Sequence, residues 1–118
     1  MNSGLSGPFS LTTNSINIAV AKTSPGTYVL GETRTDGVFV IRYVGRSDSD
    51  LNSRLQRWVG KYNQFKALYF ETKYGAFEKE CNLYHGFGGS SLLDNMIHPA
   101  TPQNTNWSCP VCNGIYRG

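Results

Sequence analysis

Two segments rich in β-forming residues, separated by a short polar turn, constrain this chain more than any other feature. The first is TYVLG, residues 27–31, and the second is VFVIRYVG, residues 38–45. Asp36-Gly37 stands between them, and this dipeptide favours the tight turn of a β-hairpin. The sequence therefore predicts an antiparallel hairpin.

Helical and extended segments follow the hairpin. The SDSD run, residues 47–50, offers N-cap candidates for a helix that runs to about Val59 and is stopped by Gly60. FKALYFET, residues 65–72, predicts a third strand, and a second helix is expected over roughly residues 74–87. The order β-β-α-β-α indicates an α+β fold with a small three-stranded antiparallel sheet flanked by helices.

The chain divides into three parts. In residues 1–24 we expect a poorly ordered N-terminal tail, because residues 1–14 offer little apolar surface, and then an edge strand in SINIAVAK, whose apolar residues alternate. Residues 25–95 hold the predicted folded domain. Residues 96–118 show little periodicity, and so long an irregular segment needs something to pin it to the domain.

Charge and cysteine usage indicate the class of partner and the compartment. The formal net charge is +3, yet seven of the eleven basic residues lie between Arg34 and Lys66, a weak indication of a polyanionic partner against a solvated charged face. The first 22 residues lack a continuous apolar stretch, and three cysteines cannot all pair within one chain. We therefore expect a cytoplasmic protein with no membrane partner and no obligate protein partner.

Short elements stand in a fixed order around the predicted hairpin and helices. They are Gly26-Thr27-Tyr28, Tyr43-Val44-Gly45, Arg46, the helical DLNSRL with Arg54, the Ala76-x-x-x-Glu80 pattern of the second helix, and later Asp94-Asn95. In this order and spacing they resemble the GIY-YIG nuclease family, over about residues 26–95. Thr27 stands where that family usually has isoleucine. A second Gly-Ile-Tyr at residues 114–116 is discounted, because no strand, partner motif or helix follows it.

The resemblance implies a GIY-YIG-like fold and a divalent-metal-dependent endonuclease that hydrolyses DNA phosphodiester bonds, with RNA left open as a partner. Glu80 would bind a catalytic Mg²⁺ or Mn²⁺, and Arg54 would hold a phosphate oxygen. Tyr28 or Tyr43 would accept the proton of water, with nearby cations lowering the phenol pKa from about 10. The candidate catalytic residues are Tyr28, Tyr43, Arg54 and Glu80, and the candidate substrate contacts are Arg46, Arg57 and Asn95.

The C-terminal cysteines predict a structural zinc site. Cys109 and Cys112 have the two-residue gap of a zinc knuckle. Cys81 and His85 stand four residues apart on the second predicted helix, so their side chains share one face. Together these four would close a Cys₃His tetrahedron and staple the irregular tail to the helix, with His98 as the rival to His85.

Two further interpretations stay open. The first is a non-catalytic nucleic-acid-binding module that keeps the fold and the basic region. The second is a zinc-stabilised interaction domain whose basic region is incidental.

Overall fold

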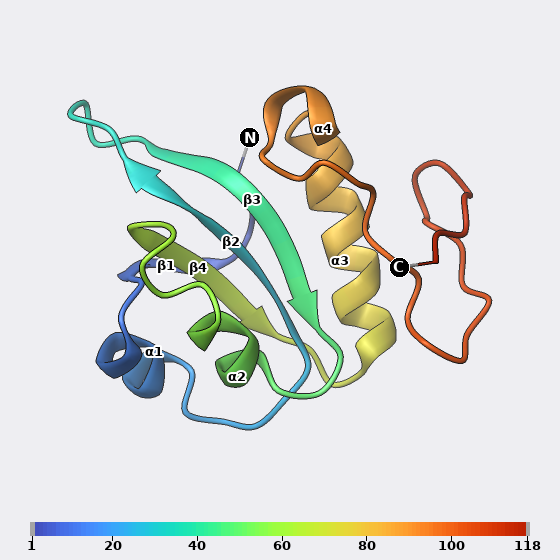
Figure 1. The fold of residues 1–118 in the computed structure, drawn as a ribbon, viewed down its shortest axis with the longest axis horizontal. Helices are drawn as coiled ribbons and strands as arrows, with labels where there is room; N and C mark the ends of the chain where they lie inside the picture. Colours follow the sequence, from blue (N-terminus) through green and yellow to red (C-terminus); the bar gives the residue numbers. More distant parts are fainter. Residues whose placement is uncertain (1, 118) are drawn as a thin grey trace.

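The computed structural model describes residues 2–117, so Met1 and Gly118, which the predicted terminal parts include, lie outside the described residues. Within this range there are four strands and four helices, arranged as in Figure 1. In chain order they are β1 (Ser6–Ser10), α1 (Thr13–Ala19), β2 (Gly26–Thr33), β3 (Phe39–Ser47), α2 (Leu51–Gln56), β4 (Gln64–Tyr69), α3 (Lys73–Gly86) and α4 (Gly89–Leu92).

The strands form one antiparallel sheet in the order β1-β4-β2-β3. The predicted hairpin is confirmed as β2 and β3, and Gly37 in its turn has a positive φ of 89°. The expected three-stranded sheet was wrong, because the fourth strand, β1, lies in residues expected to be a poorly ordered tail. Phe9 of β1 pairs with Phe65 of β4, and their ring centroids are 5.4 Å apart, so strand pairing and an aromatic contact order a polar segment.

Helix α1 replaces the predicted edge strand. The side chain of Thr12 caps it by accepting the backbone N–H of Ser15. Ile16 is 0% exposed and Ile18 is 74% exposed, whereas a strand would place both on one face. Ile16 and Val20 lie one helical turn apart and both reach the core, so the alternating letters concealed a helical period.

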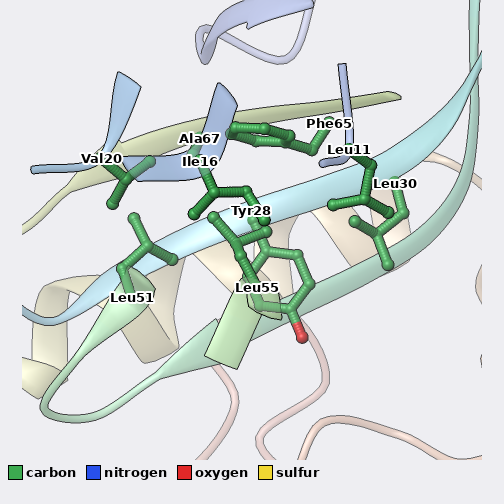
Figure 2. Close-up of a cluster of buried hydrophobic side chains, with 9 residues drawn as sticks. All are labelled: Leu11, Ile16, Val20, Tyr28, Leu30, Leu51, Leu55, Phe65 and Ala67. Atoms are coloured by element: carbon green, nitrogen blue, oxygen red, sulfur yellow. The ribbon is translucent and has the colours of Figure 1, made fainter. Parts of the chain in front are cut away.

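Strand β2 is the centre of the domain, and its residues from Gly26 to Gly31 are all buried. Tyr28 and Leu30 point to the face covered by α1 and α2, where they pack with Leu55 and Phe65 in the cluster drawn in Figure 2. Side chains on the opposite face, Val29 and Val44 with Leu83 and Tyr84, pack between the sheet and α3. The sheet therefore carries helices on both faces (Figure 1).

The sequence predicted the end of α3 more accurately than the end of α2. Helix α3 lies close to the predicted second helix, begins at the N-cap Thr72 and ends before Gly88, whose φ is 103°. Helix α2 ends at Gln56 rather than near Val59, because a three-residue turn bond from the Trp58 N–H to the Leu55 carbonyl follows it. That turn lets the Trp58 indole reach back toward the sheet.

No helix within residues 2–117 is both long enough and apolar enough to cross a lipid bilayer.

Two matched substitutions in α1 test this helix. Ile16→Ala should lower the free energy of unfolding by about 2–5 kcal/mol, since it leaves a cavity in the core. Ile18→Ala, the same change on the exposed face, should stay within about 0.5 kcal/mol of the parent. Urea denaturation of both variants checks this, and equal losses at the two positions would indicate a strand.

Candidate functional site

A pocket of about 910 Å³ opens where the hairpin, α2, α3 and the C-terminal segment meet. Arg57 is exposed at the end of α2 and is not part of the pocket lining. The structure brings the other six predicted catalytic and substrate-contacting residues into the lining: Tyr28, Tyr43, Arg46, Arg54, Glu80 and Asn95.

Arg46 joins three parts of the chain at the floor of this pocket. Its Nη1 donates to Glu80 Oε1 of α3 and to the carbonyl oxygen of Ala100, both at 2.6 Å. Its Nε donates to Asp48 Oδ1 at 2.7 Å. Only 10% of the Arg46 side chain is exposed, so these acceptors replace most of its water. The guanidinium thereby fixes β3, α3 and the C-terminal segment relative to one another.

Glu80 is a buried carboxyl group whose pKa lies near neutral pH. Burial outweighs the attraction of Arg46 and raises the pKa of Glu80 to about 7. Asp48, which shares Arg46 with Glu80, adds to this increase. A cation entering the pocket would favour the ionised form of Glu80 and lower its pKa.

The two phenols lie on neighbouring strands but differ in environment. The Tyr28 hydroxyl accepts a hydrogen bond from Trp58 Nε1 at 2.8 Å, and the ring of Tyr43 packs on Trp58 with centroids 4.5 Å apart. Burial raises the pKa of Tyr28 far above its usual value, and burial also raises that of Tyr43. The expectation that nearby cations lower these pKa values is not met by the protein alone, since Arg54 offsets only part of the effect of burial.

The structure explains the glycine at position 45 and the threonine at position 27. Gly45 lies directly across the hairpin from Tyr28, and a Cβ there would collide with the phenol ring. Thr27, which stands where isoleucine was expected, is buried and donates its hydroxyl to the Ala76 carbonyl at 2.8 Å. This bond links β2 to α3, so threonine in place of isoleucine at position 27 adds a contact between two elements that form the pocket.

Asn95 anchors the wall of the pocket. Its amide nitrogen donates to the Val44 carbonyl at 2.8 Å, and its amide oxygen accepts the Val44 N–H at 2.9 Å. The side chain therefore holds the start of the C-terminal segment against β3. Its geometry supports a positioning role more than a substrate contact.

Several pocket residues were not foreseen from the sequence. Lys73 lies seven residues before Glu80 on α3, and this two-turn spacing could have revealed it. Ser47, Asp48 and Ser49 also line the pocket, although their pattern indicated only N-cap candidates. The others come from an irregular segment without periodicity, so no pattern signalled them. They include Gln103, Asn104 and Arg117.

The donor set of the pocket fits a hard divalent cation such as Mg²⁺. Glu80 and Asp48 both line the pocket, and their carboxylate oxygens are the donor type that Mg²⁺ prefers. Mg²⁺ sites commonly use one or two carboxylates with waters and substrate phosphates, so a larger cage is not needed. Arg46 engages one oxygen of Glu80 and both oxygens of Asp48, and a metal would share these carboxylates with it.

A second cluster lies beside the pocket and could hold a metal such as zinc. The ligand atoms of His85, His98, Cys109 and Cys112 all lie within 4.8 Å of one another. The two histidine Nε2 atoms are 3.0 Å apart, and His98 Nε2 is 3.5 Å from Cys112 Sγ. Tetrahedral zinc separates two nitrogens by about 3.3 Å and nitrogen from sulfur by about 3.5 Å, so the spacing fits.

Neighbouring groups prepare this cluster for a metal. His98 Nδ1 donates to the Pro99 carbonyl at 2.8 Å, which leaves the lone pair on Nε2, the atom that faces the other ligands. The Tyr116 hydroxyl lies 3.4 Å from Cys112 Sγ and lowers the pKa of that thiol, and the Tyr116 ring stacks on His98. The lone pair of His98 Nε2 is thus available to a metal, and the Cys112 thiol loses its proton more readily than a free cysteine.

The predicted ligand set needs one correction. It placed Cys81 with His85, Cys109 and Cys112, and the structure puts His98 in the position of Cys81, so both histidines belong to the cluster. Cys81 packs in a buried group with Phe77 and Cys109, and burial, with a smaller effect of Cys109, raises the pKa of its thiol. Helical spacing put Cys81 and His85 near one another, but it could not foresee that the chain returns to place His98 beside His85.

Comparison of the chain with protein-family models, with curated proteins and with solved structures gives no match. The functional interpretation therefore rests on the geometry and chemistry of these two neighbouring sites.

Elemental analysis of matched variants tests the ligand set. Protein purified without chelator should carry about one equivalent of zinc. His98→Ala should lose most of it, because one of four ligands is removed, whereas Cys81→Ala should keep it. Zinc retained by the first variant and lost by the second would restore the set predicted from the sequence.

Proposed function

We propose that this protein is a divalent-metal-dependent endonuclease of the GIY-YIG type that hydrolyses DNA phosphodiester bonds. One observation carries the proposal: two phenols, two guanidinium groups and a buried carboxyl group, contributed by the four elements β2, β3, α2 and α3, line one pocket. These are the groups that phosphodiester hydrolysis uses to accept a proton, to bind phosphate oxygens and to hold a metal.

The charge of the pocket supports a polyanionic substrate. Among the described lining residues, four carry positive charge, Arg46, Arg54, Lys73 and Arg117, against the carboxyl groups of Asp48 and Glu80. The basic region seen in the sequence is only partly responsible, because Arg34 pairs with Asp36 and Arg42 pairs with Glu32 on the hairpin. Tertiary structure, rather than sequence clustering, gathers the cations that face the pocket.

The two phenols suit different roles. In hydrolysis the water oxygen bonds to phosphorus, the P–O3′ bond breaks, and a nearby base accepts the proton of the water. Tyr43 suits the base better than Tyr28, since it is only partly buried; burial raises the pKa of both phenols, and a bound cation would lower that of Tyr43. Tyr28, fully buried and fixed by Trp58, suits a positioning role in which its O–H donates toward the pocket.

Arg54 suits the phosphate contact. The Arg46 carbonyl accepts one of its hydrogen bonds at 3.3 Å, and the guanidinium fork has further donors for a non-bridging oxygen. When bound at Glu80, Mg²⁺ or Mn²⁺ would neutralise charge on the phosphate and on the leaving oxygen. Arg46 would hold Glu80 in place for this role.

Zinc in the His85, His98, Cys109 and Cys112 cluster completes the proposal as a structural ion. Four protein ligands leave no position for a reactive water, which is typical of a structural rather than a catalytic zinc. Its proposed role is to attach the C-terminal segment to α3.

A non-catalytic nucleic-acid-binding module is the second candidate, and the Arg46–Glu80 ion pair favours it. At 2.6 Å the guanidinium already neutralises the carboxylate that would bind the divalent ion. If this pair persists with substrate, the pocket would bind phosphate without cleaving it.

Glu80→Gln should reduce nicking of supercoiled plasmid in Mg²⁺ by at least about 100-fold, because the amide cannot replace the anionic ligand. Glu78→Gln is the matched control: Glu78 lies two residues earlier on α3, outside the pocket lining, and should cut at the parental rate. Gel electrophoresis of the plasmid gives the rates. Cleavage that survives in the Glu80 variant would remove the mechanism, and binding without cleavage by the parent would select the binding module.

The arginines of α2 offer a second matched pair. Arg54→Lys should lower the cleavage rate by about tenfold or more, since lysine lacks the planar donor fork. Arg57→Lys should change it little, because Arg57 is exposed and lies outside the pocket lining. Equal losses in the two variants would contradict the assignment of Arg54 to the phosphate.

A further inference from the structure

The C-terminal segment forms one whole side of the pocket. Residues 97–104 and Arg117 line it opposite the hairpin and α2. Figure 1 shows the chain after α4 running alongside α3 without a helix or strand of its own. The pocket therefore has one wall of regular structure and one wall of irregular chain.

The irregular wall is held to the rest of the domain by individual hydrogen bonds and side-chain contacts. Asn95 bonds to Val44 at its start, and the Thr101 N–H donates to the Tyr116 carbonyl at 2.7 Å further along. Its contacts with α3 are between side chains: Cys109 and Trp107 meet Phe77 and Cys81, Trp107 packs on Tyr74, and His98 packs on Tyr84. These contacts must offset the entropy of ordering a segment that has no helix or strand of its own. A metal bound between His85 of α3 and His98 of the wall would add a bonded link to them.

The wall contacts the Arg46 guanidinium through one carbonyl oxygen. Ala100 lies two residues after His98, and its carbonyl oxygen accepts Arg46 Nη1 at 2.6 Å. The same nitrogen donates to Glu80 Oε1. Movement of the wall would remove one of the acceptors that hold Arg46 and would uncover a side chain that is now nearly buried.

We infer that a zinc ion bound by His85, His98, Cys109 and Cys112 builds this wall and positions Arg46 through the Ala100 carbonyl, so that binding of phosphate-bearing ligands in the pocket depends on zinc. Arg46 is a positioning residue in this scheme. The inference rests on the proposed function only for the nature of the ligand, and it does not require cleavage.

The first arm measures the wall without any ligand. Zinc is removed from the wild-type protein with a zinc-selective chelator and then restored, and amide hydrogen exchange is followed across residues 97–117 and β3. Protection of residues 97–104 should fall without zinc and return with it, while circular dichroism shows that the sheet persists. Cys112→Ala should mimic zinc removal, and Cys81→Ala should behave as the parent. Unchanged protection after zinc loss would overturn the inference.

The second arm measures binding of a fluorescein-labelled single-stranded oligonucleotide, at fixed salt and without Mg²⁺ or Mn²⁺. Zinc removal should weaken binding by about tenfold, the factor that one charge-assisted hydrogen bond represents. In the Arg46→Gln variant, zinc removal should weaken oligonucleotide binding by less than about threefold, because two changes that act through the same residue are not additive. Equal losses in the two proteins would overturn the route through Arg46.

The two arms separate failure of this inference from failure of the proposed function. A zinc-loaded wild-type protein that binds neither the oligonucleotide nor inorganic pyrophosphate overturns the nuclease proposal and the ligand part of the inference. The hydrogen-exchange arm still decides by itself whether zinc builds the wall.

Discussion

Burial of β2 on both faces is the constraint on which the rest of this structure depends. A strand buried from Gly26 to Gly31 needs partners along both edges and cover on both faces. Helices α1 and α2 supply the cover on one face and α3 on the other. Tyr28 sits in this strand with its ring in the core, and Figure 2 shows its oxygen directed away from the cluster. The most buried strand of the domain thus presents a polar atom to the pocket.

The pocket shows how polar chemistry is accommodated beside such a core. Arg46 and Glu80 are both nearly buried, and each would be costly there without the other. Their pairing holds a carboxyl group with a raised pKa next to a phenol and a second guanidinium. Groups with shifted pKa values that share one cavity are typical of a site that works on a ligand. Here they also join a regular framework to an irregular wall.

The sequence could predict what depends on local pattern. The hairpin, β4 and α3 each carry a period or turn signal strong enough to identify them. Strand β1 was not predicted, because its order comes from pairing with β4. Helix α1 was predicted as a strand, because two isoleucines two residues apart also fit a strand. Spacing along α3 placed Glu80 and His85 correctly on the helix. It named His98 only as the rival to His85, because the place of His98 beside His85 depends on the path of a loop.

The contacts of residues 94 and 95 have a consequence for the sheet itself. Strand β3 forms one border of the sheet, and an open border invites another chain to add to it. The Asp94 N–H donates to the Arg42 carbonyl, and the Asn95 amide occupies both the N–H and the carbonyl of Val44. Asp94 and Asn95 thereby take the place of a neighbouring strand along this part of β3. The same segment that closes the pocket thus occupies backbone groups of β3 that an added strand would need.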